Sequence, residues 1–360
     1  MTENRLEQIG FDCFFQQEAA RFPHLFAAKV SSQHKEIYKV IGQQGEMQAK
    51  VAGKLSYSAF DARDFPAVGD WVMVDREQDS SGDAIIHHIL PRKSIFERNA
   101  AGLSNDVQII ATNIDVIFIC MSVNSDFNLR RLERYLAVAW DSGSTPVVVL
   151  TKADLCEDIG EKWGQVNEVA IGAEVIAVSS MQEEGVANVK AMVPWGKSAA
   201  FIGSSGVGKS TLINSLMEAE VLAVNNIREE DDKGRHTTTH RQLLLLPGGG
   251  AVIDTPGMRE LKLESGDLSH SFADIEEYAR QCRFSDCSHL KEPGCAVKEA
   301  IADGSLPAER FSNYLKLQRE LHYQEMKANK RDKAKAVNMS GNMNAMKKIS
   351  QQIKRNNKKR

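Results

Sequence analysis

The run Gly203-Ser204-Ser205-Gly206-Val207-Gly208-Lys209-Ser210 matches the phosphate-binding pattern G-x-x-x-x-G-K-[ST] at every position. The apolar stretch 199–202 predicts a strand before it, and Thr211 opens a stretch that predicts a helix after it. Glycines let backbone N–H groups close around a phosphate, and the helix N-terminus adds positive potential. We expect Lys209 to contact the terminal phosphates, Ser210 to bind Mg²⁺ and Thr211 to belong to the same nucleotide site. The alternative, a chance match in a loop, is disfavoured by the flanking strand and helix.

A second motif, Thr151-Lys152-Ala153-Asp154, directly follows the apolar run 146–150. The Asp154 carboxylate can accept two hydrogen bonds from the N1 and the exocyclic amine of guanine, a pattern that adenine does not offer. The stem of Lys152 would pack over the base. Thr151 stands where Asn is usual, and we expect this change to weaken the base contact. Ser179-Ser180 follows the next predicted strand and is the candidate for a second base-contacting loop, which normally reads Ser-Ala.

A third motif, Asp254-Thr255-Pro256-Gly257, follows the predicted strand 251–253. Asp254 should hold Mg²⁺ through water, and the Gly257 N–H should reach the γ-phosphate. The run 234–240 lies between the phosphate loop and Asp254, where a first switch segment belongs. One of its threonines should complete the Mg²⁺ shell, and Thr238 is the favoured one. The alternative for this run is a polar turn.

The order of the three motifs is unusual. In ordinary GTPases the phosphate loop opens the domain and the guanine-reading motif closes it, whereas here the guanine-reading motif comes first. A parallel sheet tolerates such a permutation if the spatial set of strands is preserved, so the motifs predict a circularly permuted GTPase. Met258 stands where Ras-type GTPases place the glutamine that orients the attacking water. A thioether cannot do this, so we expect slow hydrolysis by the free chain, with His236 or a partner supplying the missing group.

The hydrophobic pattern divides the chain into five parts. Residues 1–35 form an N-terminal extension with an aromatic cluster, and residues 36–98 contain short β-like runs punctuated by glycines. These runs predict a small barrel, for which an OB-fold is the natural candidate, although an SH3-like barrel would read much the same. Residues 105–264 alternate apolar strands with helices and predict a doubly wound α/β domain. Residues 265–330 predict a small α-helical zinc-binding domain, and residues 331–360 a basic tail that is disordered in isolation.

The last part of the chain concentrates three of its six cysteines. Cys282-x4-Cys287-x-His289-x5-Cys295 supplies three thiolates and one imidazole, a set suited to one tetrahedral Zn²⁺. Four protein ligands indicate a structural rather than a catalytic metal. The spacing is not the common C-x2-C knuckle, so unligated thiols remain the alternative.

Composition sets the remaining limits. The 360 residues are 42% hydrophobic and 26% charged, as expected for two or three globular domains. No stretch approaches about eighteen uninterrupted apolar residues, and the N-terminus lacks a secretory signal, so we expect a cytoplasmic chain without a membrane span. Residues 327–360 carry twelve Lys and Arg against one acidic residue, Asp332, although the net charge is −3. This tail favours a polyanionic partner, and a solvated end without a partner is the alternative.

Together these features resemble the RsgA (YjeQ-type) family of circularly permuted small ribosomal subunit biogenesis GTPases. The likeness extends from about residue 36 to residue 330. It rests on the Cys₃His spacing and on the following stretches: Pro66-Ala67-Val68-Gly69-Asp70-Trp71-Val72, 203–211, 234–239 and 254–257. The resemblance implies an OB domain, a permuted GTPase domain that uses GTP with Mg²⁺, and a zinc domain.

The resemblance also implies a partner and an activity. The partner is the small ribosomal subunit with its rRNA, late in maturation, and the activity is hydrolysis of GTP to GDP that the subunit stimulates and that leads to release. We expect the chain to act as a monomer. Two other readings remain open: a GTPase that acts on another RNA target, and an RNA-binding protein with a vestigial nucleotide site.

Overall fold

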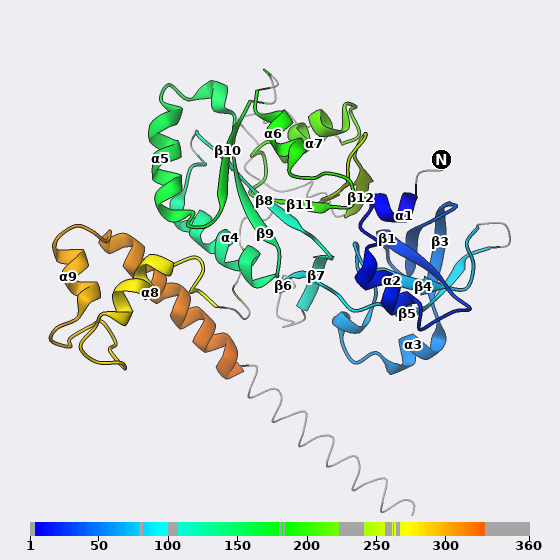
Figure 1. Ribbon diagram of the computed structural model, residues 1–360, viewed down its shortest axis with the longest axis horizontal. Helices are drawn as coiled ribbons and strands as arrows, with labels where there is room; N and C mark the ends of the chain where they lie inside the picture. Colours follow the sequence, from blue (N-terminus) through cyan, green and yellow to red (C-terminus); the bar gives the residue numbers. More distant parts are fainter. Residues whose placement is uncertain are drawn as a thin grey trace, which may run out of the picture.

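A computed structural model of the chain describes residues 4–78, 82–99, 107–124, 126–179, 182, 184–222, 241–255, 261, 263 and 267–327. A β-barrel, an α/β domain and a helical C-terminal region follow one another across the molecule (Figure 1). The basic tail expected at residues 331–360 lies outside the described residues. Among the residues described, no helix is both long and apolar enough to span a membrane.

The barrel has five strands: β1 (Phe26–His34), β2 (Ile37–Gly42), β3 (Gly45–Val51), β4 (Trp71–Val74) and β5 (Ala84–Ile89). Their order is β1-β2-β3-β5-β4, and β4 pairs back onto β1 to close the barrel. β3 and β5 run parallel, the other neighbours run antiparallel, and α3 (Gly53–Ser58) lies between β3 and β4 in the chain. A five-stranded Greek-key barrel of this kind is an OB-fold, which decides against the SH3-like alternative.

The strand β1 lies within residues 1–35, upstream of the part of the sequence that predicts the barrel. Exposed polar and buried apolar residues do not alternate cleanly along β1, because the polar residues Lys29 and Ser31 are buried beside apolar neighbours. The short helices α1 (Arg5–Gln8) and α2 (Cys13–Ala19) precede it. Phe11 and Phe15 lie 4.8 Å and 5.7 Å from the Trp71 ring centroid, so the N-terminal aromatic cluster packs on the barrel.

The α/β domain has the strand order β10-β9-β8-β11-β13-β12. All neighbours are parallel except β12 (Gln242–Leu245), which runs antiparallel to β13 (Ala251–Asp254). The other strands are β8 (Val116–Ser122), β9 (Thr145–Thr151), β10 (Glu174–Val178) and β11 (Ser198–Ile202). β12 also pairs with β1, so the barrel and the α/β domain share one eleven-stranded sheet.

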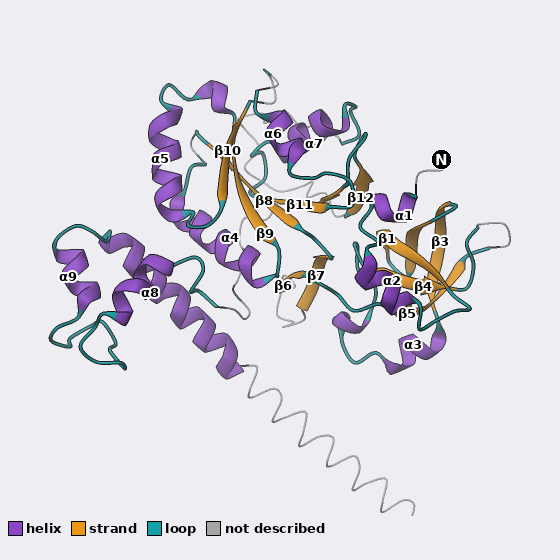
Figure 2. Ribbon diagram, in the orientation of Figure 1, coloured by secondary structure: helices purple, strands orange, loops and turns teal. Residues whose placement is uncertain are grey.

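Helices cover both faces of the α/β sheet (Figure 2). Alternate residues of β8 explain this, because Ile117 and Ile119 pack in a different core cluster from Phe118 and Cys120. The first cluster contains residues of α4 (Leu129–Asp141) and α5 (Ile159–Val169). The second contains residues of α6 (Val186–Ala191) and α7 (Lys209–Met217). This is the doubly wound arrangement that the continuous apolar strands predict.

A hairpin of β6 (Ile95–Asn99) and β7 (Val107–Thr112) connects the barrel to the α/β domain. The loop before β4 approaches it closely at Gly69, which has a φ of +97° and lies where a Cβ atom would come within 2.1 Å of the Thr112 carbonyl oxygen. The adjacent Asp70 is fully buried and accepts two hydrogen bonds from Arg92, at 2.7 and 2.8 Å. The motif around Gly69 and Asp70 therefore fixes the junction between barrel and hairpin.

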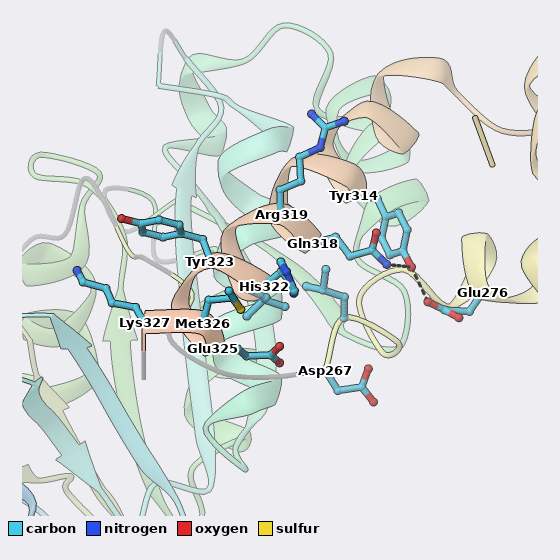
Figure 3. A pocket seen from close by; sticks show the side chains of 12 residues that line it. Asp267, Glu276, Tyr314, Gln318, Arg319, His322, Tyr323, Glu325, Met326 and Lys327 are labelled. Atoms are coloured by element: carbon cyan, nitrogen blue, oxygen red, sulfur yellow. Dashed lines mark hydrogen bonds between the residues drawn. The ribbon is translucent and has the colours of Figure 1, made fainter. Parts of the chain in front are cut away.

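The C-terminal region consists of α8 (Ala273–Arg280), α9 (Ala296–Ala302) and a helix over residues 308–327. The last helix packs against α4, where Arg134 contacts Glu320 at 2.6 Å. It also borders a pocket of about 960 Å³ (Figure 3). At one end of that pocket Tyr314 donates a hydrogen bond to Glu276 and accepts one from Gln318.

Candidate nucleotide and metal sites

The predicted phosphate loop connects β11 to α7. Gly203 opens it with a φ of +148°, and a Cβ atom there would lie 2.4 Å from the Cys120 carbonyl oxygen, so no other residue fits without a shift. Lys209 is buried at the start of α7, and its Nζ donates hydrogen bonds to the carbonyl oxygens of Gly203 and Ser204 at 2.9 and 2.8 Å. Burial lowers the pKa of Lys209. The loop carbonyl oxygens thus accept the hydrogen bonds that the Lys209 ammonium group would donate to phosphate oxygens in a nucleotide complex.

Asp254 ends β13, the strand next to the phosphate loop. Burial raises the pKa of Asp254 to about 6, and the charge of Lys209 opposes this rise. A buried carboxylate of this kind is suited to a cation, because a cation would offset the cost of burying the negative charge. Thr255, the next residue, donates a hydrogen bond to the Phe201 carbonyl oxygen and ties the two strand ends together.

The guanine-reading motif lies beside the phosphate loop in space. Thr151 is the last residue of β9, and its hydroxyl donates a hydrogen bond to the Val207 carbonyl oxygen at 2.6 Å. Asp154, in the short 3-10 helix Ala153–Leu155, accepts a hydrogen bond from the Ser179 hydroxyl at 2.7 Å. Lys152 has a φ of +58° at the turn between them. The structure therefore brings the two motifs and the predicted second base loop together, although Thr151 and Val207 are 56 positions apart in the sequence.

Asp126 is a residue of this site that the motifs did not indicate. Its carboxylate accepts a hydrogen bond from the Ser204 hydroxyl and contacts Arg131 at 2.9 Å. Asp126 follows β8, whose carboxyl end lies beside the phosphate loop. The rule that ligand sites form at the carboxyl ends of parallel strands would have drawn attention to it, but no known motif occupies that loop.

Several residues of the sequence prediction lie outside the described residues: Ser180, the run 234–240 with His236 and Thr238, Pro256, Gly257 and Met258. The described chain resumes after the third motif at Leu261 and Leu263, which are both buried. The Leu261 carbonyl oxygen accepts a hydrogen bond from Arg134 of α4, and the Leu263 N–H donates one to Glu320 of the last helix. Leu261 and Leu263 therefore connect the α/β domain with the C-terminal region.

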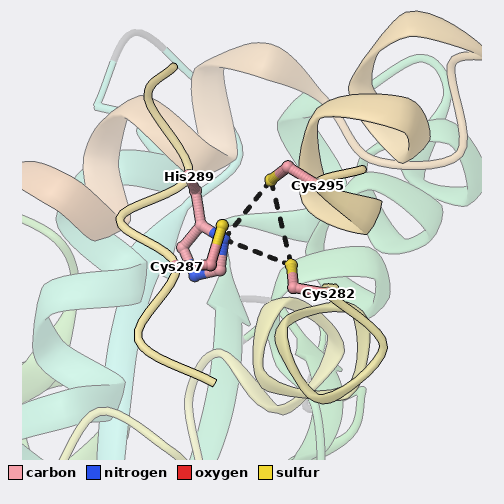
Figure 4. A group of neighbouring side chains, drawn as sticks. All are labelled: Cys282, Cys287, His289 and Cys295. Atoms are coloured by element: carbon pink, nitrogen blue, oxygen red, sulfur yellow. Dashed lines mark hydrogen bonds between the residues drawn. The ribbon is translucent and has the colours of Figure 1, made fainter. Parts of the chain in front are cut away.

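The four predicted zinc ligands converge (Figure 4). Their ligand atoms all lie within 4.8 Å of one another. Cys282 Sγ and Cys295 Sγ are 3.9 Å apart, and each is 3.5 Å from His289 Nδ1. A tetrahedral Zn²⁺, with bonds of about 2.3 Å to sulfur and about 2.0 Å to nitrogen, needs separations of about 3.8 and 3.5 Å. The donor set and the spacing of Cys282, Cys287, His289 and Cys295 therefore fit zinc.

Local backbone geometry explains how this cluster closes. His289 has a φ of +59°, and Gly294 has one of +68° with a Cβ position 3.3 Å from the Arg283 side chain. The Arg283 N–H donates a hydrogen bond to the Gly294 carbonyl oxygen, which brings Cys282 and Cys295 side by side. Four protein ligands leave no open position, so a bound zinc ion would stabilise the fold of this region rather than bind a substrate.

Known proteins resemble this chain over its whole length. A protein of Lactiplantibacillus plantarum named small ribosomal subunit biogenesis GTPase RsgA 2 is 50% identical over 355 residues, which cover 99% of this chain and all of that protein. The chain belongs to the RsgA family. The family model described as RsgA GTPase matches residues 89–264, and an RsgA protein of Oceanobacillus iheyensis is 45% identical over 91% of this chain and 93% of its own length.

Solved structures agree with the assignment of the chain as an RsgA GTPase. The crystal structure of YjeQ from Thermotoga maritima matches with a TM-score of 0.60 at 27% identity, covering 82% of this chain and 98% of that one. YloQ, described as a circularly permuted GTPase, also matches with a TM-score of 0.60, at 25% identity over 84% of this chain and 96% of its own. The predicted permutation, OB-fold barrel and GTPase class are thus confirmed, and the family implies that Mg²⁺ accompanies the nucleotide.

Proposed function

We propose that this chain binds the small ribosomal subunit late in its maturation and hydrolyses GTP there, and that hydrolysis leads to its own release. The observation that carries the proposal is the 50% and 45% identity, over 99% and 91% of this chain, to two proteins named small ribosomal subunit biogenesis GTPase. We expect it to act as a monomer in the cytoplasm, where bacterial ribosomes assemble. Its partners would be the rRNA of that subunit and GTP or GDP.

In this proposal each motif residue has one role. Lys209 would leave the carbonyl oxygens of its own loop and contact the β- and γ-phosphates. Ser210 and Thr238 would bind Mg²⁺ directly, and Asp254 would bind it through water. Gly257 contacts the γ-phosphate. Asp154 reads guanine with the support of Ser179, and Lys152 packs over the base. Asp154→Asn should therefore shift the preference from GTP to xanthosine triphosphate, and unchanged GTP binding would refute the guanine assignment.

Hydrolysis by the free chain should be slow, because Met258 cannot orient water. Purified small subunits should raise the rate by roughly 10²–10⁴-fold, the range of a positioned acid–base group. If His236 is that group, His236→Ala should remove most of the stimulation and leave GTP affinity nearly intact. His240→Ala, a second histidine of the same segment, is the matched control. Absence of stimulation in the unaltered chain would instead favour another RNA target.

The contacts of Leu261 and Leu263 support a route for release. Glu320 contacts both Arg134 of α4 and the Leu263 N–H, so it connects Leu263 and α4 to the last helix. The motif 254–257, whose glycine should contact the γ-phosphate, would act as the second switch. A change in it on loss of the γ-phosphate would be transmitted through this contact. Glu320→Ala should slow release from the subunit after hydrolysis, measured by pelleting with subunits over time. Release at the unaltered rate would exclude this route.

The basic tail should strengthen association by contacts to phosphates. Deleting Asn338–Arg360 removes seven of the twelve positive charges after residue 326. Such contacts act through counterion release, so the deletion should weaken subunit binding most at low salt and flatten its salt dependence. An unchanged salt slope would show that the tail is a solvated end without a partner.

A further inference from the structure

A pocket of about 690 Å³ lies where the barrel, the β6–β7 hairpin and the start of β12 meet. Its walls include Tyr38 and Phe65 from the barrel, Gln108 and Ile109 from the hairpin, and Arg241 just before β12. This volume lies in the range of pockets that hold small ligands or single groups of larger ones. Among the described residues, none of the phosphate loop, the guanine-reading motif or Asp254 lines this pocket.

Arg241 brings an uncompensated charge to this pocket. Its Nη1 donates a hydrogen bond to the Ile109 carbonyl oxygen at 2.9 Å, but its buried Nε has no hydrogen-bond partner among the described residues. Among the described residues, no carboxylate forms an ion pair with Arg241. Burial, and to a lesser extent the charge of Arg98, lowers the pKa of Arg241 to about 10. Burying a guanidinium without a counter-charge is costly, so the site favours an anion.

The rest of the pocket has the same electrostatic character. Lys35 and Lys50 line it at exposed positions, and Glu36 is the one carboxylate among the described lining residues. Lys50 also contacts Asp83 at 2.7 Å outside the pocket lining. The basic tail of this chain is therefore a poor occupant, because like charges would meet. An anionic group with polar neighbours is the better match.

The stretch 56–62, which contributes to the pocket wall, contains two unusually exposed aromatic side chains. Tyr57 and Phe60 have 94% and 85% of their surface accessible, and the same segment contributes Ser56 and Ala62 to the pocket wall. Large aromatic side chains so exposed gain nothing from packing in the fold. Exposed aromatic rings on a segment that also lines a cationic groove are features on which unpaired nucleic-acid bases stack.

We propose that this pocket holds one nucleotide of a single-stranded RNA, with a phosphate against Arg241 and neighbouring bases stacked on Tyr57 and Phe60. Lys35 and Lys50 contact the backbone on either side. This inference rests on the proposed function, because it specifies how the barrel side of the molecule recognises unpaired rRNA. It assigns to Arg241 a role that none of the sequence motifs indicated.

The test measures binding of a fluorescein-labelled hexauridylate to the full chain by fluorescence anisotropy at several salt concentrations. Arg241→Met keeps most of the side-chain packing and removes the charge. It should weaken binding about fivefold to tenfold and reduce the slope of log affinity against log salt by about 0.7, the value for one single-strand phosphate. Tyr57→Ala should weaken binding about fivefold or more without changing the slope. Lys39→Met, an equal loss of charge at an exposed barrel position outside the pocket lining, should change affinity less than about twofold.

A melting curve separates a binding role from a structural one. Arg241→Met should melt no lower than the unaltered chain, because it removes a buried charge without a counter-charge. Unchanged RNA affinity and salt slope in Arg241→Met would overturn the proposal. Displacement of the RNA by inorganic phosphate at equal concentration would assign the pocket to free phosphate, and better displacement by oligoglutamate would assign it to an acidic peptide; either result overturns it. Failure of small subunits to stimulate hydrolysis would refute the proposed function alone and leave this binding result standing.

Discussion

The barrel and the helical C-terminal region flank the α/β domain on different sides (Figure 1), and each junction buries one cation in a different way. At the barrel junction, Lys29 donates hydrogen bonds to the Ile9 carbonyl oxygen at 2.6 Å and to the Ser198 hydroxyl at 2.8 Å. It forms no ion pair within the described residues, and its Nζ lies 5.4 Å from the Trp71 ring centroid. Burial lowers the pKa of Lys29 to about 8.

At the other junction, Arg310 is only 2% exposed and is fully paired. It contacts Glu133 of α4 at 2.9 Å and both carboxylate oxygens of Asp274 at 2.7 and 2.8 Å. Burial alone would lower the pKa of Arg310, but Asp274 and Glu133 raise it. The buried ammonium group of Lys29, which has no ion pair among the described residues, can therefore lose its proton at an accessible pH, whereas the paired guanidinium of Arg310 keeps its charge. We therefore expect the barrel junction to respond to pH and the C-terminal junction to respond to loss of a partner.

The largest effect should come from removing the metal site beside the paired junction. Cys287→Ser should lower the zinc content from about one ion per chain and unfold the C-terminal region, because four-ligand zinc sites contribute about 10 kcal/mol or more to folding. Metal analysis and calorimetry would measure both. Cys156→Ser, at a half-buried thiol outside the cluster, is the control. A normal zinc content and melting profile in Cys287→Ser would refute the zinc assignment.

The next effect concerns the paired junction itself. Glu133→Gln should reduce the free energy of unfolding by about 3 kcal/mol, because it removes a fully buried partner of Arg310 and Arg130. Urea denaturation would measure it. Glu218→Gln breaks the surface pair with Lys190 and should cost less than about 1 kcal/mol. Equal costs for the two variants would show that burial of the first pair has no energetic consequence.

Neither junction could be predicted from the sequence, although the domains could. The strands of the α/β domain are continuous apolar runs because helices cover both faces, and the phosphate loop and the zinc cluster are local patterns. Lys29 and Ser198 are 169 residues apart, and Glu133 and Arg310 are 177 residues apart. In a single sequence Glu133 is one more charged residue on an amphipathic helix. Its burial depends on a partner that only the tertiary fold supplies.

The nucleotide site shows the same limit on a smaller scale. Its motif residues could be named because each follows a predicted strand, but the contact between Asp126 and Ser204 joins two loops 78 residues apart. Thr151 is another example, because the replacement of Asn suggested only a weaker contact to the base. The structure shows that its hydroxyl also donates a hydrogen bond to the phosphate loop, at the Val207 carbonyl oxygen.

The unpaired junction should show the third effect as a dependence on pH. Below pH 8 both the folded and the unfolded chain hold the Lys29 proton, so the folded state bears the full cost of burying the charge. Between pH 8 and the ordinary value of 10.5 the folded chain loses the proton first, and the contribution of Lys29 to stability rises with pH. The difference in unfolding free energy between Lys29→Met and the unaltered chain should therefore change by about 2–3 kcal/mol from pH 7 to pH 10, in favour of the unaltered chain.

Arg310→Met is the matched control for this pH dependence. Its cost should be the same at pH 7 and pH 10, because the paired guanidinium stays charged throughout. Denaturation curves at both pH values compare the two variants directly. A pH-independent difference for Lys29→Met would mean that the two junctions do not differ in the way proposed.

The smallest effect should appear between the two junctions, in the nucleotide site that both flank. Thr151→Val removes the hydroxyl that donates to the Val207 carbonyl oxygen and leaves that oxygen without its partner, at a cost of about 1–2 kcal/mol. Affinity for GDP and GTP should fall about tenfold, measured with a fluorescent nucleotide. Thr151→Ser keeps the hydroxyl and should bind nearly as the unaltered chain does. Neither variant should alter the pH response of the barrel junction or the zinc content, because Thr151 contacts neither. If Thr151→Ser binds as weakly as Thr151→Val, the methyl group rather than the hydrogen bond positions the loop.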